Sequence, residues 1–198
     1  MIVLAGRNLA KMAAAKAELD ELGVESCLCK TDIADRAQVQ ALAEFAASLG
    51  DVTQVIHTSG VSPSDTATEN IIRINAAGTV NMVEAFYLVL AGGGVMINFS
   101  SVAAYTMPQT DEWSQAFEAW NEPDFYDRLL TPMHQKLIDN QPETAENQLE
   151  LIHAGRWGHP YEMGALTVFL CSSGAGYING VDILADGGQN AGIFVPQI

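Results

Sequence analysis

Positively charged residues are scarce in this chain of 198 residues. Nine lysines and arginines stand against 24 aspartates and glutamates, and the formal net charge is −15. Nucleic acids and anionic membrane surfaces bind proteins through basic patches, so this charge argues against both kinds of partner. No apolar run reaches the ~18–20 residues of a membrane span, and no basic leader with an apolar stretch opens the chain. We therefore expect a cytoplasmic protein without a membrane anchor or a secretory signal.

Cysteine is rare as well, with only Cys27, Cys29 and Cys171. An odd count does not make a disulfide framework, and the C-x-C spacing has no second cluster of cysteine or histidine to complete a zinc site. We expect reduced, buried thiols and no metal. Apolar residues make up 48% of the chain and charged residues 17%, which is enough to bury a core. The length suits a single domain over residues 1–198.

Short apolar runs alternate with helical patterns along most of the chain. The predicted strands are residues 2–5, 24–29, 52–57, 95–99 and 180–185, and the predicted helices are residues 9–22, 36–49, 71–90 and 160–170, with Asp35 as the cap of the second helix. Strands that alternate with helices of this length form right-handed crossovers. The pattern predicts an α/β protein with a doubly wound parallel sheet and helices on both faces.

Residues 105–130 break this alternation, because aromatic side chains stand there among acidic residues and prolines. A long segment of this kind is often a lid or a substrate-facing loop. A packed helical hairpin that covers the edge of the sheet is the alternative, and the sequence leaves both open.

Small, polar and glycine-bearing segments follow the predicted strands. They are Gly6-Arg7-Asn8, Asp32-Ile33, Thr58-Ser59-Gly60 and Ser100-Ser101. A doubly wound sheet binds its ligand at the carboxyl ends of its strands. These segments therefore suit a nucleotide that lies across the edge of the sheet.

The chain contains several sequence motifs: Thr31-Asp32-Ile33, His57-Thr58-Ser59-Gly60, Asn75-Ala76-Ala77-Gly78-Thr79, Ile97-Asn98-Phe99-Ser100-Ser101, Gly155–Met163, Phe169–Ser173, Tyr177–Gly180 and Asp186-Gly187-Gly188. These motifs resemble those of the short-chain dehydrogenase/reductase family. The resemblance spans nearly the whole chain, apart from residues 105–130 and the tail. The resemblance implies a Rossmann-type, three-layer α/β/α domain that transfers a hydride between a nicotinamide cofactor and an alcohol/carbonyl substrate. It also implies a homodimer or homotetramer, with the surface over Tyr161–Asp186.

The same resemblance implies roles for individual residues. Ser101 would be the catalytic serine that orients the substrate, and Asn75 would support the proton relay. Asp32 and Ile33 would hold the adenine ring. The remaining cofactor contacts would come from the turn Thr58, Ser59 and Gly60 and from Thr131, which would touch the nicotinamide amide. His57 replaces an asparagine of the family turn, so we expect it to satisfy backbone groups or line the cofactor.

Arg7 bears on the choice of cofactor. In this fold an acid at the end of the corresponding strand holds the ribose 2′-hydroxyl, whereas an arginine accommodates a 2′-phosphate. Here the position offers Gly6-Arg7 and no acid. NADP(H) is therefore favoured over NAD(H). Because residues 105–130 lie where the family has its substrate loop, their aromatic character suggests a bulky apolar substrate, such as a steroid- or terpene-like alcohol.

Two family features are missing from these residues. The chain starts at what resembles the family's second strand, so the strand and glycine-rich turn that seat the pyrophosphate are absent. The acid/base tyrosine with a lysine four residues later is absent too: the residues at +4 from Tyr87, Tyr105, Tyr126, Tyr161 and Tyr177 are Ala91, Gln109, Leu130, Ala165 and Val181. A helix and a strand of the family pattern are missing between about Leu130 and Thr131.

Two hypotheses account for these gaps. In the first, the 198 residues are an incomplete part of a working reductase, and further segments around the cofactor contain the missing groups. In the second, the chain is a truncated paralogue that cannot transfer hydride and acts as a binding or assembly subunit. Folding favours the first, because removing a central strand from a parallel sheet leaves two unpaired edges in the core.

The intact mass of the protein purified from its natural source separates the two hypotheses. We expect a mass several kDa above the 21.2 kDa of these residues, because the missing segments would add to it. Electrospray mass spectrometry measures this directly. A mass of 21.2 kDa would instead support the truncated subunit.

Overall fold

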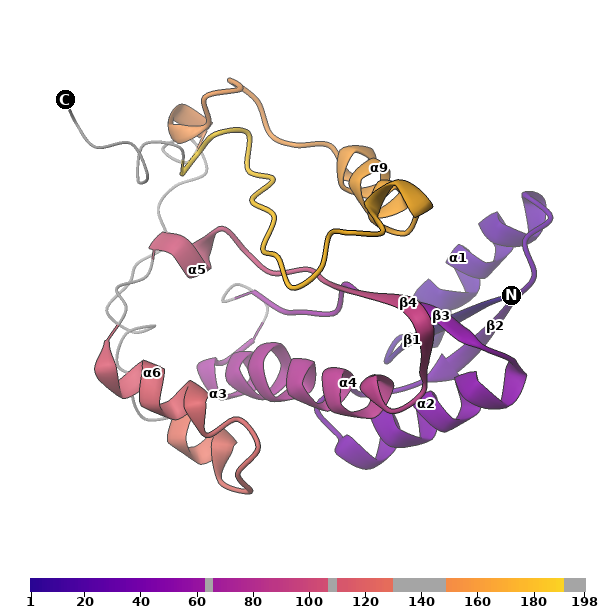
Figure 1. Cartoon of the computed structure of the whole chain (residues 1–198), viewed down its shortest axis with the longest axis horizontal. Helices are drawn as coiled ribbons and strands as arrows, with labels where there is room; N and C mark the ends of the chain where they lie inside the picture. Colours follow the sequence, from indigo (N-terminus) through magenta and orange to yellow (C-terminus); the bar gives the residue numbers. More distant parts are fainter. Residues whose placement is uncertain (63–65, 107–109, 130–148, 191–198) are drawn as a thin grey trace. The chain divides into compact units, whose positions relative to one another are not determined.

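The computed structural model describes residues 1–62, 66–106, 110–129 and 149–190 (Figure 1). The chain forms two compact units. The first comprises Met1–Phe99 and Asp111–Gln135, and the second comprises Ser100–Thr110 and Lys136–Ile198. The single domain over residues 1–198 stays a prediction.

The first unit contains the alternating strands and helices. Its elements are β1 (Ile2–Gly6), α1 (Leu9–Glu21), β2 (Ser26–Lys30), α2 (Arg36–Leu49), β3 (Val52–His57), α3 (Thr68–Ile71), the π-helix η1 (Ile72–Ala77), α4 (Gly78–Tyr87), β4 (Leu90–Asn98) and α6 (Asp111–Glu118). The second unit contains α5 (Ala103–Thr106), α9 (Pro160–Leu170) and the short 3₁₀ helix η2 (Ser173–Ala175). The order of elements predicted up to residue 99 is confirmed, with shifted boundaries around α4 and β4.

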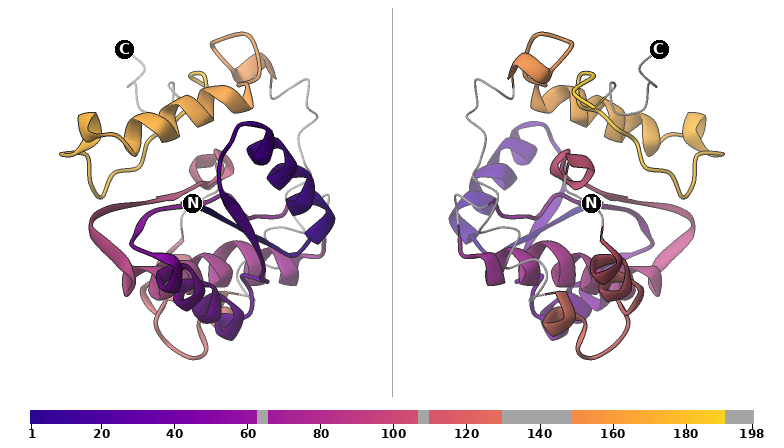
Figure 2. Two further views of the ribbon diagram at one scale, coloured as in Figure 1. Left: turned by 90° about the vertical axis from the view of Figure 1, so that its right-hand side faces the viewer. Right: turned by 90° about the vertical axis from the view of Figure 1, so that its left-hand side faces the viewer.

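The four strands form two parallel pairs, β1 with β2 and β3 with β4. Gly6 lies opposite Lys30 in the first pair, and His57 lies opposite Asn98 in the second. Helix α1 lies on one side of the strands, and α2 and α4 lie on the other (Figures 1 and 2). The predicted α/β class with parallel strands is confirmed, although the described strands form two pairs and not one continuous sheet.

Local signals in the sequence set the helix ends. Asp35 caps α2, as predicted, because its Oδ1 accepts hydrogen bonds from the backbone N–H groups of Ala37 and Gln38. Asn8 caps α1 in the same way through the N–H of Lys11. Gly23 follows α1 with φ of +71°, a left-handed conformation that glycine adopts without steric cost.

The main core lies between α2, α4 and β3. Val39, Leu42 and Ala43 are 0–3% exposed and share one face of α2, because residues three and four apart lie on the same side of a helix. They pack in one cluster with Val55 of β3 and Phe86 of α4. A contact between His57 and Thr79 places the carboxyl end of β3 beside the start of α4.

Residues 111–129 pack against the long helical segment of the first unit. Ala116, Phe125 and Leu129 are buried in one cluster with Ile72. The Tyr126 hydroxyl donates to the Glu69 carbonyl at 3.3 Å. The described residues of the segment thus pack on α3 and the π-helix, and the substrate loop over residues 105–130 and the hairpin at the edge of the sheet both stay predictions.

Helix α9 of the second unit begins at an ion pair. Arg156 donates two hydrogen bonds to the Glu162 carboxylate at 2.8 and 2.7 Å, and Glu162 also accepts from the His159 N–H at 2.7 Å. These hydrogen bonds lower the pKa of Glu162 to about 2. The carboxylate therefore caps the helix as an anion at neutral pH.

The predicted strand over residues 180–185 is wrong. Residues 181–185 have no regular secondary structure. A strand exists only through hydrogen bonds to a neighbouring strand, and the described residues of the second unit contain no other strand. Within the part of the chain that the structure describes, no helix is long and apolar enough to cross a membrane.

Leu42 tests the main core. We expect Leu42→Ala to lower the free energy of unfolding by about 2–5 kcal/mol, because a 3% exposed side chain leaves a cavity. Urea denaturation followed by circular dichroism measures the loss. Leu49→Ala on the same helix is the control, since Leu49 is 40% exposed. Equal losses in the two variants would contradict this assignment of the core.

Candidate cofactor site

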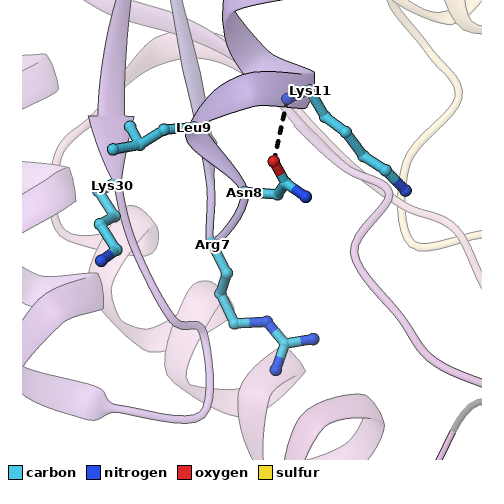
Figure 3. Close-up of a pocket in the computed structure, with 5 residues that line it drawn as sticks. All are labelled: Arg7, Asn8, Leu9, Lys11 and Lys30. Atoms are coloured by element: carbon cyan, nitrogen blue, oxygen red, sulfur yellow. Dashed lines mark hydrogen bonds between the residues drawn. The ribbon is translucent and has the colours of Figure 1, made fainter.

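Three cationic residues line one pocket where β1 ends and α1 begins, and their charged ends point in different directions (Figure 3). Arg7 extends from the connection between them, Lys11 from the first turn of α1, and Lys30 from the last position of β2 (Figure 3). Lys30 comes close because the parallel register pairs it with Gly6, the residue before Arg7. Together with Asn8 and Leu9 they line an open pocket of about 630 Å³.

The charges of this cluster are not neutralised within the part of the chain that the structure describes. Four of the other cations have carboxylate partners: Lys16 pairs with Asp20, Arg36 with Glu84, Arg128 with Asp124 and Arg156 with Glu162. Arg7, Lys11 and Lys30 form no such pair among the described residues, and all three are exposed. In a chain of net charge −15, this donor set fits an anionic group such as a phosphate.

The turn after β2 is held against α4. Asp32 accepts the Ala34 N–H at 3.0 Å through its carboxylate. Ile33 is 9% exposed within the main core, and its carbonyl accepts a hydrogen bond from the Asn81 side chain at 2.9 Å. The approach requires glycine at position 78, because a Cβ there would lie 2.9 Å from Ile33 Cγ1 and Cδ1. The part of Ile33 in adenine binding stays a prediction.

The loop after β3 is bound to the π-helix through Asn75. The Asn75 side chain accepts the Val61 N–H at 2.9 Å and donates to the Val61 carbonyl at 2.8 Å. The predicted cofactor residues Thr58, Ser59 and Gly60 precede Val61 and are exposed. Asn75 thus bonds backbone groups in this structure, and its part in a proton relay stays a prediction.

His57 lies behind this loop and is only 3% exposed. Its Nε2 atom is 3.2 Å from the Thr79 hydroxyl oxygen, and the Thr79 hydroxyl donates to the Asn75 carbonyl at 2.7 Å. Burial lowers the pKa of His57, because the charged ring would lose its hydration. His57 thus contacts a side-chain hydroxyl, and the expectation that it satisfies backbone groups or lines the cofactor stays a prediction.

The structure does not place two of the predicted residues at this site. Ser101 belongs to the second unit, where it precedes α5 and its carbonyl accepts the Ala104 N–H at 3.1 Å. Thr131 lies outside the described residues. The structure therefore brings together the loop after β3, the π-helix and the turn after β2, with Arg7 at the end of β1.

Lys11 and Lys30 were not among the predicted site residues. Lys11 follows Arg7 by four positions, and Lys30 is the last residue of the neighbouring strand. The available signal was that the chain has only nine cations and that two of them, Arg7 and Lys30, lie just after predicted strands. Only the register of β1 and β2 shows that they line one pocket.

Family models match both parts of the chain. The model described as short chain dehydrogenase matches residues 1–114, and the model described as enoyl-(acyl carrier protein) reductase matches residues 128–190. The first match covers more than half of the chain and includes the cation cluster and the Asn75 region.

Individual proteins agree with the family models. D-threitol dehydrogenase of Mycolicibacterium smegmatis is 30% identical over 188 residues, which cover 79% of this chain and 70% of that protein. Gluconate 5-dehydrogenase of Gluconobacter oxydans is 23% identical, covering 94% and 84%. A short chain dehydrogenase from Burkholderia cenocepacia, solved in complex with NADP, shares the fold with a TM-score of 0.70 and 17% identity, covering 95% and 86%. The chain therefore belongs to the short-chain dehydrogenase/reductase family, whose named relatives are oxidoreductases acting on CH–OH groups.

Proposed function

We propose that this protein binds NADP(H) in preference to NAD(H) and serves hydride transfer between that cofactor and an alcohol/carbonyl substrate. The observation that carries the proposal is the cluster of Arg7, Lys11 and Lys30 at the end of β1, with no carboxylate in the Gly6-Arg7-Asn8 segment. The NADP complex of the Burkholderia relative supports the choice of cofactor.

The charge of the ligand explains the preference. A 2′-phosphate presents two negative charges, and the planar guanidinium of Arg7 can donate two hydrogen bonds to it. A ribose 2′-hydroxyl would instead need an acceptor, which an aspartate or glutamate provides in NAD-binding members of this fold. Lys11 and Lys30 add positive charge at the same pocket.

The other predicted residues have roles around the same nucleotide. Asp32 and Ile33 would hold the adenine ring, the turn Thr58–Gly60 would line the cofactor, and Thr131 would contact the nicotinamide amide. The cofactor supplies the hydride when it is bound. Ser101 would orient the substrate oxygen by a hydrogen bond, and Asn75 would support proton transfer.

The acid/base group is the open part of this mechanism. No tyrosine of the 198 residues has a lysine four positions later. Tyr105 follows Ser101 by four positions, but its hydroxyl donates to the Asp182 carboxylate, and this contact raises the pKa of Tyr105. A general base at neutral pH needs a lowered phenol pKa. Tyr105 is therefore a poor substitute for the family tyrosine.

A bulky apolar alcohol, steroid- or terpene-like, remains our proposal for the substrate. The half-exposed aromatic side chains of Phe117 and Trp120 support it. We also propose a homodimer or homotetramer through the apolar surface of Tyr161–Asp186, where Tyr161 and Val168 are exposed. The cytoplasm is the proposed location, because the three cysteines are unpaired.

A second candidate function is a binding or assembly subunit that cannot transfer hydride. The missing tyrosine–lysine pair favours it. The first candidate predicts that NADPH raises the melting temperature and supports reduction of a ketone, whereas the second predicts no shift of the melting temperature with nucleotide.

Arg7→Ala tests the cofactor proposal. We expect this variant to bind adenosine 2′,5′-bisphosphate about tenfold more weakly than the unaltered protein, because a hydrogen bond to a charged group contributes about 1.5–3 kcal/mol and 1.4 kcal/mol is tenfold. Binding of 5′-AMP, which lacks the 2′-phosphate, should change little. Isothermal titration calorimetry at low salt measures both affinities.

Lys16→Ala is the matched control. Lys16→Ala also removes one positive charge, in this case from α1. Lys16 pairs with Asp20 at 2.7 Å and does not line the pocket. This variant should leave both affinities unchanged. Equal affinity of the unaltered protein for the two nucleotides would refute the NADP preference, and absence of binding to either nucleotide would favour the second candidate.

A further inference from the structure

The loop of Thr58, Ser59 and Gly60 is held at both ends by hydrogen bonds that meet at Asn75. After the loop, the Val61 backbone is bound directly by the Asn75 side chain. Before the loop, His57 reaches the Asn75 carbonyl through the Thr79 hydroxyl. The loop residues that would line the cofactor are thus connected on both sides, by hydrogen bonds, to one residue of the π-helix, Asn75.

The geometry assigns the proton on the His57 ring. Thr79 has one hydroxyl proton, and the 2.7 Å distance to the Asn75 carbonyl places that proton toward Asn75, because a carbonyl can only accept. The Thr79 oxygen must then accept from His57, 3.2 Å away. His57 is therefore the Nε2–H tautomer, and its neutral form leaves Nδ1 without a proton.

Thr167 in α9 makes the same hydrogen bond within a helix as Thr79 does. Its hydroxyl donates to the carbonyl four residues earlier, that of Met163, at 2.8 Å. This is an ordinary bond of threonine within a helix. Thr79 makes the same bond but also accepts from a residue 22 positions away, at the end of β3. Its hydroxyl therefore links a strand end to the π-helix.

We propose that His57 is a positioning residue of the cofactor site, acting through Thr79 on the loop of Thr58–Gly60. The proposal rests on the proposed function in one respect, namely that this loop contacts the nucleotide. A loop that is already fixed at both ends loses less conformational freedom when a ligand binds. Removing the link before the loop should therefore weaken nucleotide binding through the loop.

The tautomer is tested by ¹⁵N NMR of the histidine rings, which number four in the chain. His57→Gln identifies the signal of His57. We expect the neutral Nε2–H form in the unaltered protein and in Thr79→Ser, which keeps the hydroxyl. In Thr79→Val, which has a similar shape but no hydroxyl, we expect the Nε2–H population to fall and the amide of Val61 to exchange faster with solvent.

Binding of NADPH to the same variants tests positioning. We expect Thr79→Val to weaken the affinity several-fold, since one neutral hydrogen bond contributes modestly to stability, and Thr79→Ser to restore it. Thr167→Val is the matched control, because it removes a similar hydroxyl bond without a histidine partner. It should leave NADPH binding unchanged.

The outcomes separate this proposal from the proposed function. The Nδ1–H tautomer in the unaltered protein, or a His57 signal that is the same in Thr79→Val, would overturn the link. A changed signal with unchanged NADPH affinity in Thr79→Val would overturn the positioning role. If the unaltered protein binds no nucleotide, the proposed function and the cofactor role of His57 both fail, and the tautomer result still decides whether the link exists.

Discussion

The two hydrogen bonds between the Asn75 side chain and the Val61 backbone are the contact on which the candidate site depends. They join the loop after β3 to the π-helix, and both amide atoms of Asn75 take part. A π-turn inside a longer helix often marks a functional site. Here the π-helix contains Asn75 and ends just before α4. The side chain of Ile33 packs closely against Gly78, the first residue of α4. Three chain segments therefore meet around one short stretch of helix.

Electrostatics give the site its second property. The chain as a whole repels anions, since its net charge is −15. Salt at 0.1 M ionic strength limits the range over which an exposed charge acts to about 10 Å. A phosphate is therefore attracted only where cations are locally concentrated and unpaired. The pocket of Arg7, Lys11 and Lys30 meets this condition. The four cations of the described chain that pair with carboxylates do not.

Membership of a family does not establish that this chain completes the family's reaction, because a fold can hold several functions. The turn after β2 and the loop after β3, for which we propose nucleotide contacts, are present. The glycine-rich turn that seats the pyrophosphate and the tyrosine–lysine pair that would move the proton are not found among the 198 residues. The proposed nucleotide contacts and the proton transfer thus depend on different residues.

Much of this arrangement was predictable because it rests on local signals. Apolar runs and helical periodicity predicted the elements up to residue 99, Asp35 marked a helix start, and the polar segments after each strand indicated the site. The wrong prediction over residues 180–185 has a physical reason, since a strand needs a partner that may be distant in sequence. Gly92, Gly93 and Gly94 lie inside β4, where its pairing with β3 shifts register between Leu90 and Val95.

The sequence by itself determined the α/β order, the helix caps and the family, because these depend on neighbouring residues and short motifs. Only the tertiary structure decided that Lys30 joins Arg7, since this follows from the register of β1 against β2. It alone placed His57 beside Thr79, 22 positions away. Such contacts arise from the packing of strands against helices, and no periodicity along the chain records which side chains that packing brings together.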